Sequence, residues 1–416
     1  MAFHEFHSQQ QLKLDKEVQS IIDKFEINQV KLIKLCNEYT DSLQIFKVNH
    51  LFGTGQEAGD VVLAYLQRPF FKICLVRVNF NNSQILHQQC NKISQELFNS
   101  EHQLAERMCA YTLKFLRLYL PHLYDTPFIL PFIVQDYPVR YYSLPVKYQR
   151  LLQLAGIYNV QVKVTSESLA SLNYTNYSTY FMGASKNINL IASCFIGETY
   201  CSCIRVTNSK AGLLDFRIPL TKLPKTDFDF HTIDRFDKLI TSDHISETVR
   251  NCLIFLHSRR QILSKYHSLC DLPNCIKIHF KLDTDTMAHI VLDESEKLSI
   301  ANLVMLQQWE LETNTNDRQV IKKIVKAVIK RSATLSAIPI VVEIMKHIKH
   351  LKEQNETFQS ATIGCNGSLI EIFPDYNKYF SETLANSPLG PDIAKKINVT
   401  TNMEAIEIGG ACLVYQ

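Results

Sequence analysis

The sequence lacks long apolar segments. Its longest nearly apolar stretches, at 128–134 and 337–342, are much shorter than the ~20 residues that a membrane-spanning helix needs. The N-terminal segment MAFHEFHSQQQLKLDKE has no apolar core of the kind found in secretory signal peptides. We therefore expect no membrane contact and a cytoplasmic location, with entry into the nucleus left open.

An excess of charge of one sign is also missing. The 416-residue chain has 44 Lys and Arg residues against 41 Asp and Glu residues, a formal net charge of +3. A dedicated nucleic-acid-binding protein usually has a strong basic patch. The basic run at 322–331 is interleaved with Ile and Val, which predicts an amphipathic surface helix. We therefore predict no contact with nucleic acid.

Cysteine is sparse, and none of the twelve cysteines forms a C-x-x-C pair. A disulfide framework needs a denser set, so we expect free thiols. Cys201 and Cys203 share one face of a predicted strand and are expected to be core residues. His347 and His350 lie on a basic helical segment and are expected on a solvated face. No metal site is predicted.

Apolar periodicity predicts strands and helices in both halves of the chain. We expect strands at 61–66, 71–78, 84–90, 127–134, 160–165, 188–195 and 200–206. We expect two helices within 15–43 and further helices at 101–120, 236–266, 319–349 and 375–386, with Pro339 kinking or breaking the longest one. Asn-Gly at 366–367 predicts a hairpin between strands at 358–364 and 369–373. Strands followed by helices in each half predict two related α/β domains separated by a cleft.

Several short motifs in the second half of the chain occur in a fixed order. They are LDTDT (282–286), NTNDR (314–318), RSATLSA (331–337), IGCNGSL (363–369), SPLG (387–390) and GGACLV (409–414). This series resembles the C-terminal half of fungal glucokinases and hexokinases, and TGQEAGD at 54–60 also fits that family. The resemblance covers about 20–416. It implies an α/β, two-domain, actin-like sugar-kinase fold that closes on hexose and ATP, with domains at 19–206 and 207–416. The polar residues 1–18 are expected to form a poorly ordered leader.

The first phosphate loop of that family is altered in this chain. In the family a strand ends in Asp-Leu-Gly-Gly-Thr-Asn, whose glycines let the backbone approach a phosphate. The aligned residues 65–70 read YLQRPF, so Tyr65 replaces the acid and both glycines are absent. Pro69 also removes a backbone donor. The comparison implies no phosphate cradle of the family's kind, with Arg68 left as a candidate contact to an anion.

The sugar and catalytic motifs of the family keep some polar residues here. The family's catalytic base is the Asp of Asn-Asp-Thr, which accepts a proton from the sugar hydroxyl. Alignment places Glu167 at the base and Ser166 at the sugar-contacting Asn. Asp237 corresponds to the sugar-binding acid of Phe-Glu-Lys-Met. In the second phosphate loop Gly197 remains as a candidate phosphate contact, and Glu198 stands where phosphate would approach.

Scaffold motifs persist while most ligand-contacting motifs are changed, including the adenosine-side Gly-Ser-Gly loop, which reads AIEI at 405–408. Because phosphoryl transfer depends on positioning and electrostatics, we favour a non-catalytic hexokinase-like protein with a regulatory or carbohydrate-sensing role and no cofactor. Its candidate partners are a hexose or sugar phosphate, and an active hexokinase or another regulatory protein. The alternative is an active, divergent hexose kinase that uses ATP and Mg²⁺. It would use Glu167 as the general base, Asp237 for sugar hydroxyls, and Arg68 or Lys72 for phosphate.

Overall fold

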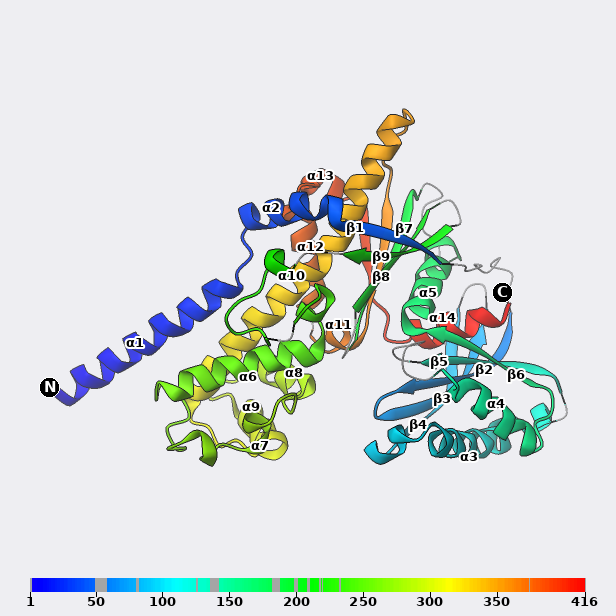
Figure 1. Cartoon of the computed structure of the whole chain (residues 1–416), viewed down its shortest axis with the longest axis horizontal. Coiled ribbons are helices and arrows are strands. Elements are labelled where there is room, and N and C mark those ends of the chain that lie inside the picture. Colours follow the sequence, from blue (N-terminus) through cyan, green and yellow to red (C-terminus); the bar gives the residue numbers. More distant parts are fainter. Residues whose placement is uncertain are drawn as a thin grey trace.

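The computed structural model describes residues 2–48, 58–79, 82–124, 126–134, 142–181, 188–197, 201–207, 210–216, 218, 220–231, 233–373 and 375–415. Most of the TGQEAGD motif, and Glu198 of the second loop, lie outside these described residues. The described strands form two sheets that lie in two separate lobes (Figure 1).

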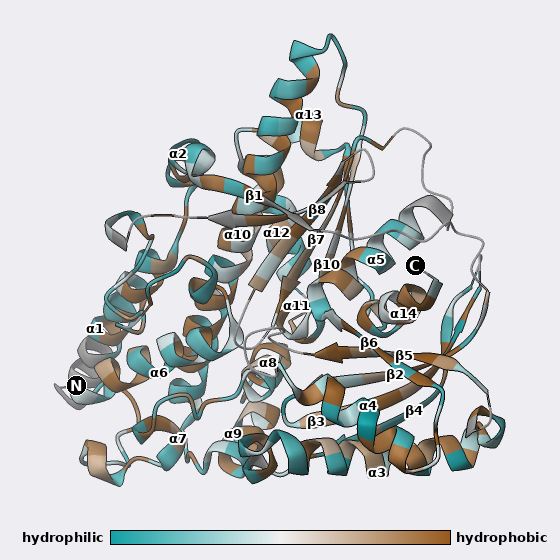
Figure 2. Ribbon diagram, turned by 45° about the vertical axis from the view of Figure 1, so that its right-hand side comes forward, coloured by the Kyte–Doolittle hydropathy of each residue, from teal (hydrophilic) through white to brown (hydrophobic). Residues whose placement is uncertain are grey.

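The larger sheet has six strands in the order β1-β9-β8-β7-β10-β11. Its strands are β1 (Leu43–Val48), β7 (Leu190–Ile196), β8 (Cys201–Thr207), β9 (Lys210–Phe216), β10 (Ala361–Asn366) and β11 (Ile397–Thr400). β10 pairs in parallel with both β7 and β11, whereas β1, β7, β8 and β9 pair antiparallel. β7 and β10 are buried along their whole length, and Figure 2 shows the central strands of both sheets as mostly hydrophobic.

The smaller sheet has five strands in the order β4-β3-β2-β5-β6. They are β2 (Gly59–Gln67), β3 (Phe70–Val78), β4 (Gln84–Lys92), β5 (Phe128–Val134) and β6 (Val160–Ser166). Helices α3 (Glu101–Tyr119) and α4 (Leu144–Leu154) cover its outer face. Two other helices, α5 (Glu167–Phe181) and α14 (Ala405–Ala411), pack on each other between the two sheets (Figure 1).

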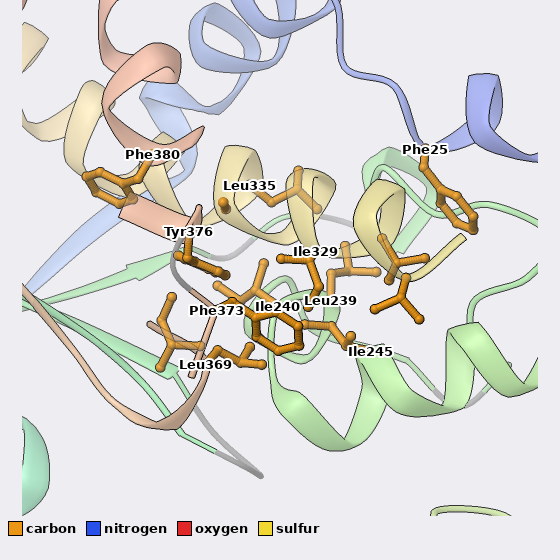
Figure 3. Close-up of a cluster of buried hydrophobic side chains, with 14 of the residues drawn as sticks. Phe25, Leu239, Ile240, Ile245, Ile329, Leu335, Leu369, Phe373, Tyr376 and Phe380 are labelled. Carbon is orange, nitrogen blue, oxygen red and sulfur yellow. The ribbon is translucent and has the colours of Figure 1, made fainter. Parts of the chain in front are cut away.

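The remaining helices belong to the lobe of the larger sheet and share its hydrophobic core. They are α1 (Ala2–Phe25), α2 (Gln29–Tyr39), α6 (Ser242–Ser258), α7 (Asn274–Lys277), α8 (Thr284–Leu292), α9 (Ser299–Trp309), α10 (Thr315–Glu353), α11 (Ser368–Ile372), α12 (Tyr376–Asn386) and α13 (Gly390–Ala394). α10 is their centre, because its residues 331–344 are buried without interruption. Figure 3 shows Ile329 and Leu335 of this helix among side chains from α1, α6, α11 and α12.

Most predicted elements are confirmed within one to four residues, but four expectations differ from the structure. The helix expected at 236–266 is shorter, because α6 covers only Ser242–Ser258. α10 is a continuous helix that contains Pro339 rather than breaking there. The leader expected at 1–18 is instead part of α1, whose Leu14 and Val18 are buried. The predicted hairpin at 358–373 is wrong: β10 ends at Asn366 and a helix begins at Ser368. The reason is that β10 finds parallel partners far away in the chain instead of an adjacent strand.

The predicted domain boundary also differs from the observed arrangement. A boundary between 206 and 207 falls inside β8, in the middle of the larger sheet. The smaller sheet is built from the continuous segment 59–166, whereas the larger sheet takes strands from both sides of that segment. The physical cause is strand pairing: β7 and β8 pair with each other and, through β7, with β10 from the end of the chain.

A buried carboxylate on α10 makes the stability of the protein depend on pH. Glu343 is 2% exposed, and its Oε1 lies 2.9 Å from Nε of Arg205 on β8. Burial raises the pKa of Glu343 to about 7, against the opposing charges of Arg205 and Lys346. An acid with a raised folded-state pKa keeps a proton that the unfolded chain has already released. The stability it contributes is therefore fully present below the ordinary pKa of 4.5 and is lost as the pH rises through about 7.

We expect Glu343→Gln to remove this pH dependence, because the amide does not ionise. Between pH 4.5 and pH 8 the wild type should lose about 3 kcal/mol of unfolding free energy relative to the variant. Urea unfolding of both proteins across this range measures the difference. Glu382→Gln, at an exposed position of α12, is the control and should follow the wild type. Parallel pH profiles for the wild type and Glu343→Gln would contradict the prediction.

Candidate functional site

A small cleft lies where the two lobes meet. Its lining comes from both sheets and from the helices α5, α11 and α14, and consists of Tyr65, Gln67, Lys72, Glu167, Phe195, Gly197, Gly367, Ser368, Glu371, Met403, Ile406 and Glu407. The space left for a water-sized molecule is only about 30 Å³, which is room for one or two water molecules.

Glu167 sits at the junction between the smaller sheet and the helices that join the lobes. β6 ends at Ser166, whose Oγ accepts a hydrogen bond from the Leu169 amide at 3.3 Å and so caps the first turn of α5. Glu167 is the first residue of that helix, where the helix dipole favours a negative charge. It is 1% exposed and accepts a hydrogen bond from the hydroxyl of Tyr65 on β2. The Glu167 carboxylate is thus held by the protein's own side chain.

Lys72 on β3 makes the second contact across the cleft. Its Nζ lies 3.2 Å from Oε1 of Glu407 on α14 and 5.3 Å from the centre of the Tyr65 ring. Burial acts to lower the pKa of Lys72, but the Glu407 carboxylate more than offsets it, so the pKa is raised. Lys72 is therefore charged and already paired with an anion.

A third acidic side chain lines the cleft. Glu371 on α11 accepts a hydrogen bond from the Gly367 amide at 3.3 Å. Burial raises the pKa of Glu371, and the charge of Glu407 raises it further. The cleft lining thus holds three carboxyl groups, Glu167, Glu371 and Glu407, against the single ammonium group of Lys72.

Two turns close the cleft on the side of the larger sheet. Gly367 follows β10 with a φ of +113°, and a Cβ there would lie 2.3 Å from the Ile196 carbonyl oxygen. Gly197 follows β7, and its carbonyl accepts the Ser242 amide at 3.3 Å. The Ser242 hydroxyl also lies 3.4 Å from the Ser368 hydroxyl. These contacts fix the two turns against each other and against the start of α6.

The structure brings together only some of the residues singled out in the sequence. Glu167 and Gly197 line the cleft, next to Ser166, whose hydroxyl caps α5. Arg68 and Asp237 are not part of the cleft lining. The Arg68 guanidinium stacks over the Phe98 ring at 4.4 Å, and Asp237 accepts a hydrogen bond from Nε of Arg235 at 2.9 Å.

Sequence reasoning missed three cleft residues in their actual roles: Tyr65, Glu371 and Glu407. For two of them, the sequence contained an indication that they belong to the site. Tyr65 was identified as the replacement of the family's acid, and Glu407 lies in the segment 405–408 that replaces the adenosine-side loop. Residues from both altered motifs, 65–70 and 405–408, therefore line the cleft together.

Other sequence predictions concern thiols, metals and membranes. All twelve cysteines are free, as predicted, with Cys203 buried and Cys201 partly buried. In the part of the chain that the structure describes, no group of three or more His, Cys, Asp or Glu side chains is placed to hold a metal ion. Among the described helices, none combines the length and the apolar character needed to cross a bilayer.

Comparisons with known proteins agree with this architecture. Residues 230–416 match the family described as hexokinase. Glucokinase-1 of Saccharomyces cerevisiae is 24% identical over 99% of both chains, and glucokinase-1 of Kluyveromyces lactis is 25% identical over 96% of this chain and 98% of its own. The structure of Schistosoma mansoni hexokinase complexed with glucose superposes with a TM-score of 0.73 and 14% identity, covering 97% of this chain and 99% of its own. By its motifs, its relatives and its two-lobed fold, this chain is similar to fungal glucokinases and hexokinases, and its residues 230–416 match the hexokinase family.

Proposed function

We propose that this protein is a hexokinase-fold protein that does not transfer phosphoryl groups and has a regulatory or carbohydrate-sensing role. One observation carries the proposal: the cleft is occupied by its own side-chain pairs, Tyr65 with Glu167 and Lys72 with Glu407. Both pairs would have to break before a sugar and a nucleotide could enter. Each pair joins groups that are buried or partly buried, where replacing a partner with water is costly.

The state of Glu167 supports this reading. A general base must come within hydrogen-bonding reach of the sugar hydroxyl whose proton it accepts. The Glu167 carboxylate is 1% exposed and already accepts the Tyr65 hydroxyl. In the family's pattern an acid, not a tyrosine, occupies the position of Tyr65. The substitution therefore places a hydrogen-bond donor against the candidate base.

The charged groups of the cleft independently support the proposal that the protein does not transfer phosphoryl groups. Phosphoryl transfer depends on cations and backbone donors that neutralise the triphosphate. Lys72 is paired with Glu407, and the carboxyl groups in the lining outnumber it three to one. Carboxylates can hold Mg²⁺, but they repel the phosphates themselves where water is scarce, and Lys72, the one ammonium group of the lining, is already paired.

A second function, an active divergent hexose kinase, is favoured by one feature. Glu167 lies at the N-terminus of α5 and lines the cleft, which is where a base would be needed. In this alternative, ATP with Mg²⁺ would be the phosphoryl donor and a hexose the acceptor. The experiment that separates the two functions is hexose-dependent ADP formation.

We expect purified protein with ATP and Mg²⁺ to release no more ADP in the presence of glucose, fructose, mannose or N-acetylglucosamine than the Glu167→Ala variant does. A coupled ADP assay measures this. Glu167→Gln, which keeps the shape and one acceptor oxygen, is the second variant in case the alanine variant unfolds. Hexose-dependent turnover that both substitutions abolish would overturn the proposal and establish the kinase.

The carbohydrate-sensing part of the proposal has its own test. The Schistosoma mansoni relative was solved with glucose, so a hexose or a sugar phosphate is our candidate ligand for this chain. Titration calorimetry with glucose and with glucose 6-phosphate, each with and without ATP and Mg²⁺, measures binding apart from turnover. Binding of a sugar without binding of ATP supports sensing. Binding of neither leaves a protein partner as the regulatory target.

A further inference from the structure

A second, larger concavity lies on the larger lobe, outside the cleft. It is a groove of about 530 Å³ that is open to solvent, within the usual range for binding sites in proteins. Its lining, which we call the α10–α13 groove, consists of Met345, Ile348, Lys349, Lys352, Glu356, Thr357, Phe358, Pro388, Leu389, Ile393 and Lys396. Figure 1 shows the end of α10 that forms one wall projecting beyond the larger sheet.

The wall formed by α10 has the periodicity of a helix-binding surface. Met345 and Ile348 are three residues apart, as are Lys349 and Lys352, so an apolar row and a basic row run side by side along the helix. Phe358, Leu389 and Ile393 extend the apolar floor. A partner helix that lies in such a groove presents apolar anchors at every third or fourth position.

The charges at the rim are not balanced within the groove. Lys349 and Lys352 are exposed, and no acidic side chain in the described ranges forms an ion pair with either of them. Lys396 donates to the Phe358 carbonyl at 3.2 Å, which holds a third positive charge at the rim. Glu356 is the only acidic residue in the lining. Three lysines against one glutamate make the groove complementary to an acidic partner.

We infer that the α10–α13 groove binds an acidic amphipathic helix of a partner protein. The partner's apolar side chains would enter the floor around Ile348 and Phe358, and its carboxylates would pair with Lys349 and Lys352. A nucleic acid fits less well, because the floor is apolar and the basic rim is limited to a few lysines. This inference rests on the proposed regulatory function, for which it supplies the class of partner.

The groove and the cleft are joined by one strand. Phe358 precedes β10 and lines the groove, while Gly367 follows β10 and lines the cleft. At ~3.3 Å per residue, the strand separates the two sites by roughly 20 Å. A partner at the groove would therefore contact the segment that leads directly into the buried strand that positions the Gly367 turn.

The experiment is a selection from a displayed library of random amphipathic helical peptides against the full immobilised chain. Counter-selection uses the Lys349→Glu/Lys352→Glu variant, whose substitutions are on exposed positions. We expect enriched peptides to combine Leu or Phe at helical spacing with flanking Asp or Glu. Enrichment of neutral or basic peptides, or no enrichment over the counter-selected variant, would overturn the inference.

Fluorescence anisotropy of the best peptide then tests the contacts one by one. The double charge reversal should weaken binding at least tenfold, as should Ile348→Asp in the floor. Lys13→Glu/Lys16→Glu is the matched control, because these lysines are also three apart and exposed on a helix, α1, and it should bind as the wild type does. Equal affinity for all four proteins would reject the site. Glu167→Ala should bind normally, so failure of the proposed function in the ADP assay and failure of the groove remain distinguishable.

Discussion

Asp229→Asn is expected to lower the free energy of unfolding by about 3–5 kcal/mol, because it leaves a buried guanidinium without its counter-ion. Arg331 on α10 binds Asp229 through two nitrogen–oxygen contacts of 2.8 Å each. It also donates to the Pro224 carbonyl at 2.9 Å. Asp229 in turn accepts the Thr226 amide at 2.6 Å and the Thr248 hydroxyl of α6 at 3.2 Å. The pair therefore ties α10 to α6 and to the 224–229 turn.

Urea unfolding measures the effect, and the same turn supplies a matched control. Lys24 of α1 pairs with Asp227 at 2.6 Å, but these side chains are 44% and 82% exposed. Lys24→Met should therefore cost less than about 1 kcal/mol. Arg331→Met is a second variant of the buried pair, and it leaves the Asp229 carboxylate, instead of the guanidinium, without its counter-ion. If Asp229→Asn and Lys24→Met cost the same, the buried pair does not hold the lobe together.

Gly367→Ala is the second substitution with a large expected effect, about 3 kcal/mol of unfolding free energy. Gly367 has a φ of +113° and a ψ of 164°, an extended positive-φ conformation that is essentially restricted to glycine and costs another residue about 1–3 kcal/mol. The new Cβ would also lie 2.3 Å from the Ile196 carbonyl oxygen and 2.8 Å from its carbon. Because these are backbone atoms of the buried strand β7, relieving the clash must shift the strand or the turn, and such overpacking costs a further 1–3 kcal/mol or so.

Gly156→Ala is the control for a positive φ without a clash. Gly156 has a similar φ of +100°, but a Cβ there meets no atom within 4 Å. Only the conformational cost, about 1 kcal/mol, is expected for it. Thermal and urea unfolding of both variants give the comparison. Equal losses would show that the Gly367 turn can move away from β7, and with it the wall of the cleft.

The strands of the smaller sheet followed from local sequence patterns, as did β7 and β8 of the larger sheet, whereas β1 and β9 were not predicted. β2, β3 and β5 are short apolar runs bounded by turn residues, and such runs are buried in almost any compact arrangement. The prediction of a hairpin at 366–367 also rested on a local pattern, and it was wrong. Asn-Gly favours a tight turn, but β10 pairs in parallel with β7 and β11, and parallel pairing is determined by residues distant in the chain.

The candidate site, too, was predicted from the sequence only in part. The resemblance placed Glu167 and Gly197 in one site, and both line the cleft. Neither pattern nor resemblance indicated that Tyr65 would bond to Glu167, 102 residues away, or that Lys72 would pair with Glu407, 335 residues away. Arg68 is the opposite case. Its positive charge suggested a contact to an anion, but in the structure its guanidinium group stacks on the Phe98 ring.

The sequence alone determined the kinds of elements, the family and the loss of the glycine-rich loops, because these depend on residue type and on spacing along the chain. The tertiary structure alone decided what fills the space those loops left. Ion pairs and hydrogen bonds form between whichever groups the packed sheets and helices bring within about 3 Å, and that proximity is set by the whole fold. The pairing of Tyr65 with Glu167 and of Lys72 with Glu407 across the cleft is a property of that packing.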